Sequence, residues 1–171
     1  EISVEGNNVC VRDFGRGIPL GKVVECVSQI NTGAKYNDDV FQFSVGLNGV
    51  GTKAVNALSS QFEVVSHREG QFVRAGFERG KLKGEQKGKD SEAPDGTFIR
   101  FTPDPEIFGR YAWNEDSIAH RLRYYAFLNA GLKLQYDGET FQSKNGLADL
   151  LAQEIGDEPP LYDIVHCREE K

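Results

Sequence analysis

Asp13-Phe14-Gly15-Arg16-Gly17-Ile18-Pro19 is the stretch that decides the fold of this chain, together with Gly46-Leu47-Asn48-Gly49-Val50-Gly51. In the first stretch an acidic side chain stands among glycines, which let a ligand approach the backbone closely. A carboxylate accepts hydrogen bonds but cannot donate them, so Asp13 suits the amino group of adenine and not the carbonyl oxygen of guanine. The second stretch leads into a predicted helix, whose free N–H groups and dipole favour phosphate. Together they predict an adenine-nucleotide pocket.

Each stretch also has other interpretations. Asp13 can be an ordinary turn aspartate after a strand. Asp13-Phe14-Gly15 matches the metal-binding motif of protein kinases, but only twelve residues precede it, which leaves no room for the kinase catalytic loop. The order G-x-x-G-x-G differs from the dinucleotide fingerprint G-x-G-x-x-G, and the chain contains no G-K-[ST] of a Walker A loop. The second stretch can also be a flexible loop that ends at a helix.

Two further polar residues are candidates for the same pocket. Thr97 follows Gly96 at the start of a predicted strand, although threonine is common in strands. Lys35 lies in a polar stretch, residues 31–44, that predicts a long loop of the kind that often serves as a lid. Lys35 either contacts phosphate or is simply solvated.

The composition sets limits on the function. The chain has 171 residues, 39% hydrophobic and 27% charged, which fits one soluble globular domain. Its net charge of -6 argues against the domain as a whole gripping nucleic acid. Three scattered cysteines without a C-x-x-C pair favour a reducing compartment, and we expect a cytoplasmic protein. No apolar run is long enough to span a membrane.

The residue pattern predicts an α+β fold with a largely antiparallel mixed sheet and helices on one face. Strands are predicted at residues 2–5, 9–12, 62–67, 72–77, 97–102, 132–136 and 140–142, with a further strand beginning at 161. Helices are predicted at residues 22–30, 52–58, 113–131 (with Gly131 as the C-cap) and 146–155. Residues 80–95, rich in Lys, Glu and Gly, predict a mobile surface loop, and residues 156–160 predict a linker.

The motifs, in the order D-x-G-x-G, G-x-x-G-x-G and G-T, resemble those of the GHKL (Bergerat-type) ATPases. Within this class, residues 13–19, Thr32-Gly33-Ala34-Lys35-Tyr36, residues 45–51 and Val55-Asn56-Ala57-Leu58-Ser59 are similar to the B subunits of bacterial type IIA topoisomerases. The short connection from Pro19 to the next helix, and Asn48 where gyrase usually has His, resemble topoisomerase IV more than gyrase. The resemblance covers nearly the whole chain.

The resemblance implies a set of ATP contacts. Asp13 would bind the adenine amine, partly through a water that Thr97 shares. Gly15, Gly17, Ile18 and Pro19 would line the base. Arg16 would lie at the pocket mouth, and Arg68 either lies there too or is a solvated turn residue. Lys35 would approach the outer end of the triphosphate. The loop that wraps the triphosphate would consist of Gly46, Leu47, Asn48, Gly49, Val50, Gly51 and Thr52.

The resemblance also places parts of the machinery outside the chain. In the family, a helix before the first hairpin supplies a catalytic Glu and an Asn that helps hold Mg²⁺, so we expect no catalytic base and no metal ligand within this chain. Glu25 matches neither position. The chain lacks Met and opens on a predicted strand, so we expect an N-terminally truncated fragment that does not hydrolyse ATP. Residues 1–156 would be the ATP-binding domain, and residues 157–171 a linker and the first strand of a transducer domain.

For the intact protein, the resemblance implies an ATP-dependent topoisomerase. ATP binding and hydrolysis would close a dimeric gate and drive passage of one DNA duplex through another. The expected partners are a second B subunit, the topoisomerase A subunit, duplex DNA bound through other domains, and ATP-competitive inhibitors, but no membrane. Two alternatives remain open: another GHKL ATPase such as the mismatch-repair protein MutL, and a non-enzymatic interaction domain whose glycine loops are only turns.

Overall fold

The computed structural model describes residues 1–29, 50–156, 162 and 165. The chain divides into two compact units, Glu1–Ala112 and Trp113–Lys171. The predicted loop 31–44 lies wholly outside the described residues. The strand predicted from residue 161 lies largely outside them. The predicted domain boundary after residue 156 stays a prediction.

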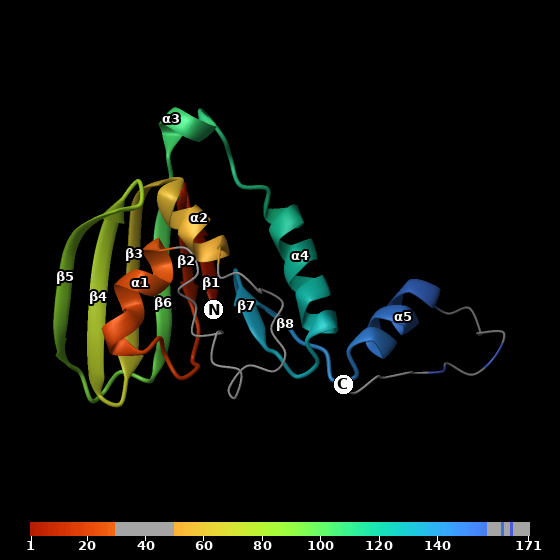
Figure 1. Cartoon of the computed structure of the whole chain (residues 1–171). Coiled ribbons are helices and arrows are strands. Elements are labelled where there is room, and N and C mark those ends of the chain that lie inside the picture. The colour runs from red at the N-terminus through yellow and green to blue at the C-terminus, as the bar shows by residue number, and fades with distance from the viewer. Residues whose placement is uncertain (30–49, 157–161, 163–164, 166–171) are drawn as a thin grey trace. The chain divides into compact units, whose positions relative to one another are not determined.

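The first unit is built on an antiparallel sheet (Figure 1). Its strands follow the order β5-β4-β3-β6-β2-β1 across the sheet. Their bounds are β1 Ile2–Glu5, β2 Asn8–Arg12, β3 Ser59–Arg68, β4 Gln71–Glu78, β5 Lys81–Lys89 and β6 Gly96–Pro103. Each neighbouring pair is antiparallel, as predicted. Because β6 lies between β2 and β3, it joins the N-terminal hairpin to the rest of the sheet.

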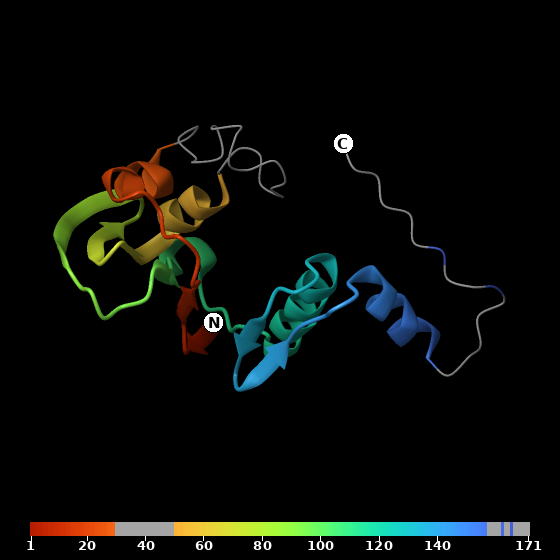
Figure 2. The ribbon, with the colours of Figure 1, turned by 90° about the horizontal axis from the view of Figure 1, so that it is seen from below.

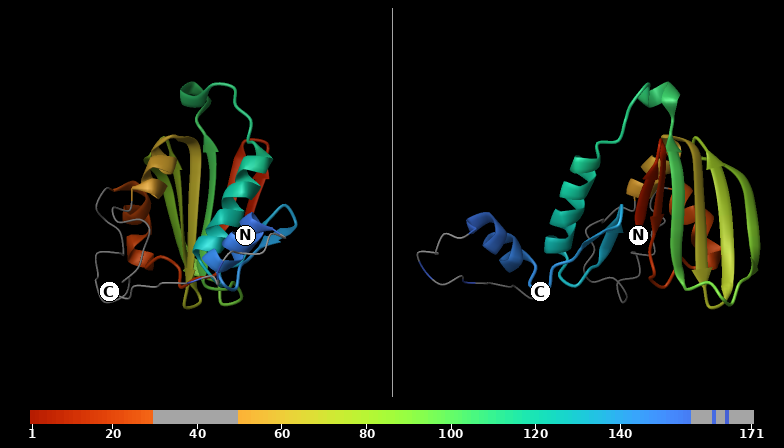
Figure 3. Two further views of the ribbon diagram at one scale, coloured as in Figure 1. Left: turned by 90° about the vertical axis from the view of Figure 1, so that its right-hand side faces the viewer. Right: turned by 180° about the vertical axis from the view of Figure 1, so that it is seen from behind.

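Two short helices cover one face of this sheet, α1 (Val23–Ser28) and α2 (Gly51–Ala57), and they lie side by side (Figure 2). A 3₁₀ turn at Leu20–Lys22 precedes α1. A cluster of buried residues fills the space between helices and sheet: Val23, Val27, Phe62, Val64, Val73, Ala75 and Phe77. Phe62 and Val64 alternate along β3 with residues on the opposite face, as a pleated strand requires. Seen from behind in Figure 3, the opposite face carries neither α1 nor α2.

The prediction of a loop across residues 80–95 was wrong for its first part. Lys81–Lys89 forms β5, which pairs with β4 along its whole length. The strand lies at the edge of the sheet, and nearly all of its residues are exposed. A strand with both faces in water needs no apolar alternation, and lysines are typical of protected sheet edges. The periodicity that reveals a half-buried strand was therefore absent.

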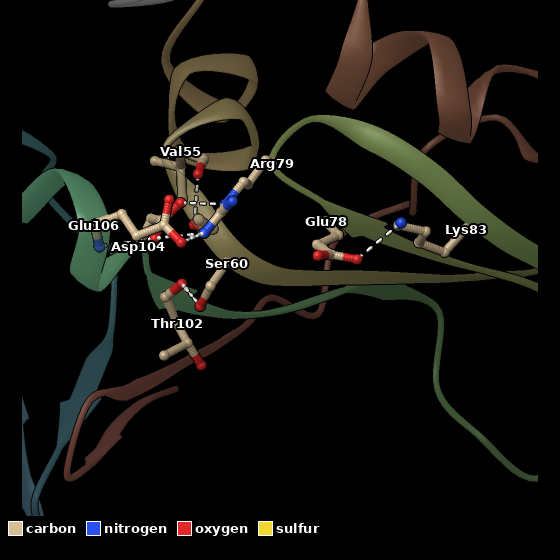
Figure 4. A network of polar contacts seen from close by, with 9 residues as sticks. Val55, Ser60, Glu78, Arg79, Lys83, Thr102, Asp104 and Glu106 are labelled. Carbon is tan, nitrogen blue, oxygen red and sulfur yellow. Dashed lines mark hydrogen bonds and ion pairs between the residues drawn. The ribbon is translucent and has the colours of Figure 1, made fainter.

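A polar network holds the C-terminal end of α2 (Figure 4). The Arg79 backbone N–H donates to the Ser59 carbonyl (2.9 Å), and the Gly80 N–H donates to that of Asn56 (3.1 Å). The Arg79 guanidinium donates to the Asp104 carboxylate (2.5 Å). Asp104 is 1% exposed and caps the short helix α3 (Pro105–Phe108). The Glu106 backbone N–H, and then the Arg79 guanidinium, hold the pKa of Asp104 below its usual value.

The second unit contains α4 (Glu115–Leu128), the hairpin β7 (Leu134–Tyr136) and β8 (Glu139–Phe141), and α5 (Leu147–Ile155). The hairpin turns at Asp137-Gly138, as predicted, and both residues have positive φ. The predicted C-cap at Gly131 was wrong. Helix α4 ends two residues earlier, where the side chain of its C-cap residue Asn129 donates to the Tyr125 carbonyl (2.8 Å).

The other helix boundaries differ only slightly from the predictions. Helix α1 is shorter than the predicted range 22–30, because a 3₁₀ turn occupies its start and Ser28 is its last residue. Helix α2 starts one residue earlier than predicted and ends one residue earlier.

Candidate nucleotide site

The loop after β2 is fixed at one end of the sheet, between the start of β6 and the end of β3. The Asp13 backbone N–H donates to the Thr97 carbonyl (2.9 Å), which continues the β2–β6 pairing by one residue. The buried Ser66 hydroxyl, on β3, donates to the Ile18 carbonyl (2.8 Å). Residues far apart in the sequence therefore position both ends of this loop.

Two glycines allow this close backbone approach. A Cβ at Gly96, where φ is 140°, would overlap the Asp13 carbonyl oxygen. A Cβ at Gly17, where φ is 69°, would overlap the His67 carbonyl oxygen and lie 3.0 Å from the Ser66 hydroxyl. Side chains other than hydrogen are disfavoured at such φ values as well. Both positions therefore need glycine for structural reasons alone.

Asp13 is exposed, and one of its carboxylate oxygens, Oδ1, accepts a hydrogen bond from the Gly15 N–H (2.9 Å). This is the turn role that the sequence left open. Among the described residues, Oδ1 is the only Asp13 carboxylate oxygen that accepts a hydrogen bond, so Oδ2 is available to a ligand. The turn thus fixes the carboxylate in place without using all of its acceptor capacity.

Thr97 lies beside Asp13 on the helix-covered side of the sheet. It is 9% exposed and stands directly opposite Ser66 in the β3–β6 register. The alternation along β6 places Thr97 with Ile99 and Phe101, which pack against the core. Asp13, Ser66 and Thr97 therefore meet at one end of the sheet, where the glycines leave room for close approach.

The turns around this end are cross-linked by further hydrogen bonds. The Glu69 N–H donates to the Asp95 carboxylate (2.9 Å), and the Asp90 N–H donates to the Gly70 carbonyl (2.9 Å). The side chain of Arg12 donates to the Pro94 carbonyl (2.8 Å). The segment that leads into Gly96 is therefore tied to the β3–β4 turn and to the end of β2.

The predicted arginines lie near this end but differ in what the structure shows of them. Arg68 is the last residue of β3, and its Nε lies 3.3 Å from the Glu69 carboxylate. This pairing fits the solvated-turn interpretation, and the pocket-mouth role stays a prediction. Arg16 is exposed in the loop after β2. Pro19, at the other end of the loop, accepts a hydrogen bond at its carbonyl from the Lys22 N–H (2.8 Å).

The predicted phosphate loop is described only at its end. Val50 precedes α2, and Gly51 and Thr52 form its first turn. No side chain caps this helix start. Lys35 and residues 46–49 lie outside the described residues, so their predicted roles stay predictions.

Two residues of this site were not predicted from the sequence: Ser66, which anchors the loop, and Asp95, which holds the segment before Gly96. Ser66 had a signal, because it is a small polar residue at an inward position of an otherwise apolar alternation with Phe62 and Val64. Asp95 had none that distinguishes it from other loop acids. Among the described residues, no three His, Cys, Asp or Glu side chains are grouped so that they could hold a metal ion. Over the same residues, no helix has the length and apolarity needed to cross a membrane.

Several known proteins are similar to this chain. It is 58% identical over 165 residues to the B subunit of DNA topoisomerase 4 from Borreliella burgdorferi, an alignment that covers 96% of this chain and 27% of that protein. It is 35% identical over 178 residues to the B subunit of DNA gyrase from Thermotoga maritima, covering 96% of this chain and 28% of that protein. No protein-family model matches the chain.

A solved structure agrees with these relatives. The crystal structure of the 43K ATPase domain of Thermus thermophilus gyrase B, in complex with an aminocoumarin, matches with a TM-score of 0.75 and 31% identity. The match covers 95% of this chain and 44% of that chain, so the predicted fold class is confirmed. This chain spans little more than a quarter of the length of the topoisomerase and gyrase relatives named above. Over that span, the chain belongs to the family of bacterial type IIA topoisomerase B subunits.

Proposed function

We propose that this chain is an ATP-binding domain and that the end of the sheet around Asp13 holds the adenine. Asp13 Oδ2 accepts a hydrogen bond from the adenine amino group, and Thr97 assists through a shared water. Gly15, Gly17, Ile18 and Pro19 line the base. The observation that carries the proposal is the fixed position of Asp13: its backbone N–H donates to the Thr97 carbonyl, and its carboxylate accepts from the Gly15 N–H.

The rest of the nucleotide is assigned by the resemblance. Arg16 and Arg68 flank the mouth of the pocket, Lys35 approaches the outer phosphate, and residues 46–52 wrap the triphosphate. Mg²⁺ accompanies ATP and offsets the charge of the phosphates. The resemblance puts the metal ligand and the catalytic base in a helix before the first hairpin, so neither is assigned to a residue of this chain.

For the intact protein, we propose the activity of an ATP-dependent type IIA DNA topoisomerase, closer to topoisomerase IV than to gyrase. The relatives support this, with the higher identity to a topoisomerase 4 protein. A second B subunit and an A subunit are the proposed partners, and the cytoplasm is the proposed location. The net charge of -6 makes this domain a poor DNA-binding surface, so DNA is assigned to other parts of the protein.

Calorimetric titration of the full-length protein with ADP and GDP tests the pocket. The wild-type protein should bind ADP and not GDP. Asp13→Asn should lose ADP binding, because an amide presents a donor as well as an acceptor to the adenine amine. Equal binding of ADP and GDP, or ADP binding that survives Asp13→Asn, would contradict the assignment of Asp13. Decatenation by the full-length protein with its A subunit tests the wider activity.

A further inference from the structure

Helix α2 carries a lysine in an unusual place. Lys53 is 6% exposed, and its ammonium nitrogen has no hydrogen-bond partner among the described residues. Lys53 also forms no ion pair within those residues. The lysines that do pair with acids there, Lys22, Lys83 and Lys87, have exposed side chains. Burying an unpaired ammonium is strongly unfavourable, so a buried lysine that keeps its charge needs an anionic partner.

The direction of the side chain follows from helix geometry. Lys53 and Asn56 are three residues apart, so they lie on the same face of α2. Asn56 donates to the Val27 carbonyl at the end of α1 (2.9 Å), which places this face against α1 and away from bulk water. In an α-helix, Cα–Cβ bonds tilt toward the N-terminus. The Cα–Cβ bond of Lys53 therefore tilts toward Gly51 and the start of the helix.

The positive charges at the start of α2 are not balanced by an acid within the described first turn of that helix. The start of a helix carries a partial positive charge, and a lysine in the first turn is unfavourable there. No side chain caps this start of α2, and its first turn, Gly51 to Lys53, contains no acid. A buried ammonium and a positive helix end on one side of a helix suit a phosphate group, which would neutralise both.

We propose that Lys53 is a phosphate ligand of the bound nucleotide. Its ammonium group donates to a phosphate oxygen as a compact point charge, which suits a site that must bind a flexible phosphate chain. The inference rests on the proposed adenine site, and it adds a residue that neither the glycine motifs nor the resemblance singles out. The proposal makes a specific prediction: replacing Lys53 should weaken the binding of ligands that carry phosphate and leave recognition of the base unchanged.

The test compares ligands with and without phosphate on the full-length protein. ADP and adenosine are titrated by calorimetry into the wild-type protein, Lys53→Met and Lys53→Arg. Lys53→Met keeps the length of the side chain and removes its charge. Lys81→Met serves as the control, since Lys81 is an exposed lysine at the start of the edge strand β5. Thermal unfolding without ligand is measured for every variant.

We expect Lys53→Met to weaken ADP binding by about 10- to 100-fold, as the loss of a charged hydrogen bond does, and to leave adenosine binding unchanged. Lys53→Arg should retain part of the ADP affinity, and Lys81→Met all of it. The unfolding temperature of Lys53→Met without ligand should equal or exceed that of the wild type, because an unpaired buried charge is gone.

Three results would overturn the inference. Unchanged ADP binding in Lys53→Met would show that the ammonium does not touch phosphate. An equal loss of ADP and adenosine binding, together with a lower unfolding temperature, would show a purely structural lysine. Wild-type protein that binds neither ligand would overturn the proposed function as well. Asp13→Asn keeps the two proposals apart, since it should weaken adenosine and ADP alike.

Discussion

Replacing Gly96 by alanine tests how the nucleotide site is positioned. Its φ of 140° and the overlap of a new Cβ with the Asp13 carbonyl oxygen together forbid a side chain in the present geometry. Holding alanine at such a φ costs about 1–3 kcal/mol. Moving the loop to relieve the overlap would break the hydrogen bond from Asp13 to Thr97 (2.9 Å) and leave a group unpaired, another ~1–3 kcal/mol.

The change in local opening free energy for Gly96→Ala is therefore about 2–6 kcal/mol, from the two contributions above. At the lower end, the Asp13 amide should exchange with solvent about 30-fold faster. Hydrogen exchange of the full-length protein, followed in peptides that cover residues 9–20, measures this change. ADP binding should weaken in parallel, because Asp13 moves.

Gly84→Ala is the matched control. Gly84 lies in β5, and a Cβ there meets nothing within 4 Å. Alanine at a compatible position stabilises by about 0.4–1 kcal/mol through the unfolded chain. If Gly96→Ala leaves both the exchange of residues 9–20 and ADP affinity at the level of Gly84→Ala, the reasoning about the close approach of Gly96 and Asp13 is refuted.

Two further predictions concern single hydrogen-bonding groups. Ser66→Ala leaves the Ile18 carbonyl without its 2.8 Å partner, so it should destabilise the loop by about 1–3 kcal/mol and weaken ADP binding in calorimetry. Ser60→Ala, on the same strand but bonded to Thr102 at 3.2 Å, should leave ADP binding unchanged, and equal effects would argue against a special role for Ser66. Asp149 has its pKa lowered to about 2, first by the Ser143 hydroxyl and then by Asn145. A carboxyl with a lowered pKa stabilises the folded form above its unfolded value of about 4, and this contribution is lost as the pH falls from about 4 to about 2. As the pH falls over that range, exchange in the segment before α5, measured relative to the intrinsic exchange rate at each pH, should therefore rise in the wild type and stay flat in Asp149→Asn, and a flat wild-type profile would contradict the assignment.

The hairpins were predictable because their turns and periodicity are local. Asp137-Gly138 and Glu69-Gly70 both have positive φ, as the sequence required of tight turns. The position of the Asp13 loop was not predictable by physical reasoning alone. Its partners Ser66 and Thr97 belong to strands whose order across the sheet is set by non-local pairing, and the motifs alone do not specify that order. The loop was linked to Thr97 in advance only through the family resemblance.

The errors have physical causes as well. β5 was missed because an exposed edge strand carries no apolar alternation, so its lysines and glycines are typical of a loop. Lys53 was missed because a long polar side chain in a helix is ordinarily assumed to reach solvent. Burial decides both cases, and burial depends on neighbours that lie far away in the sequence.

The insertion of β6 between β2 and β3 also bears on how the molecule forms. The first hairpin, β1–β2, pairs within itself over a few residues, but β2 meets β6 only through pairs such as Val9 with Phe101. Contacts between distant residues form slowly, because a long segment of chain must be closed first. During synthesis, the Asp13 loop therefore has no fixed place until residue 103 has left the ribosome and β6 has joined both neighbours. Nucleotide recognition should therefore appear only after β6 has paired with both of its neighbours.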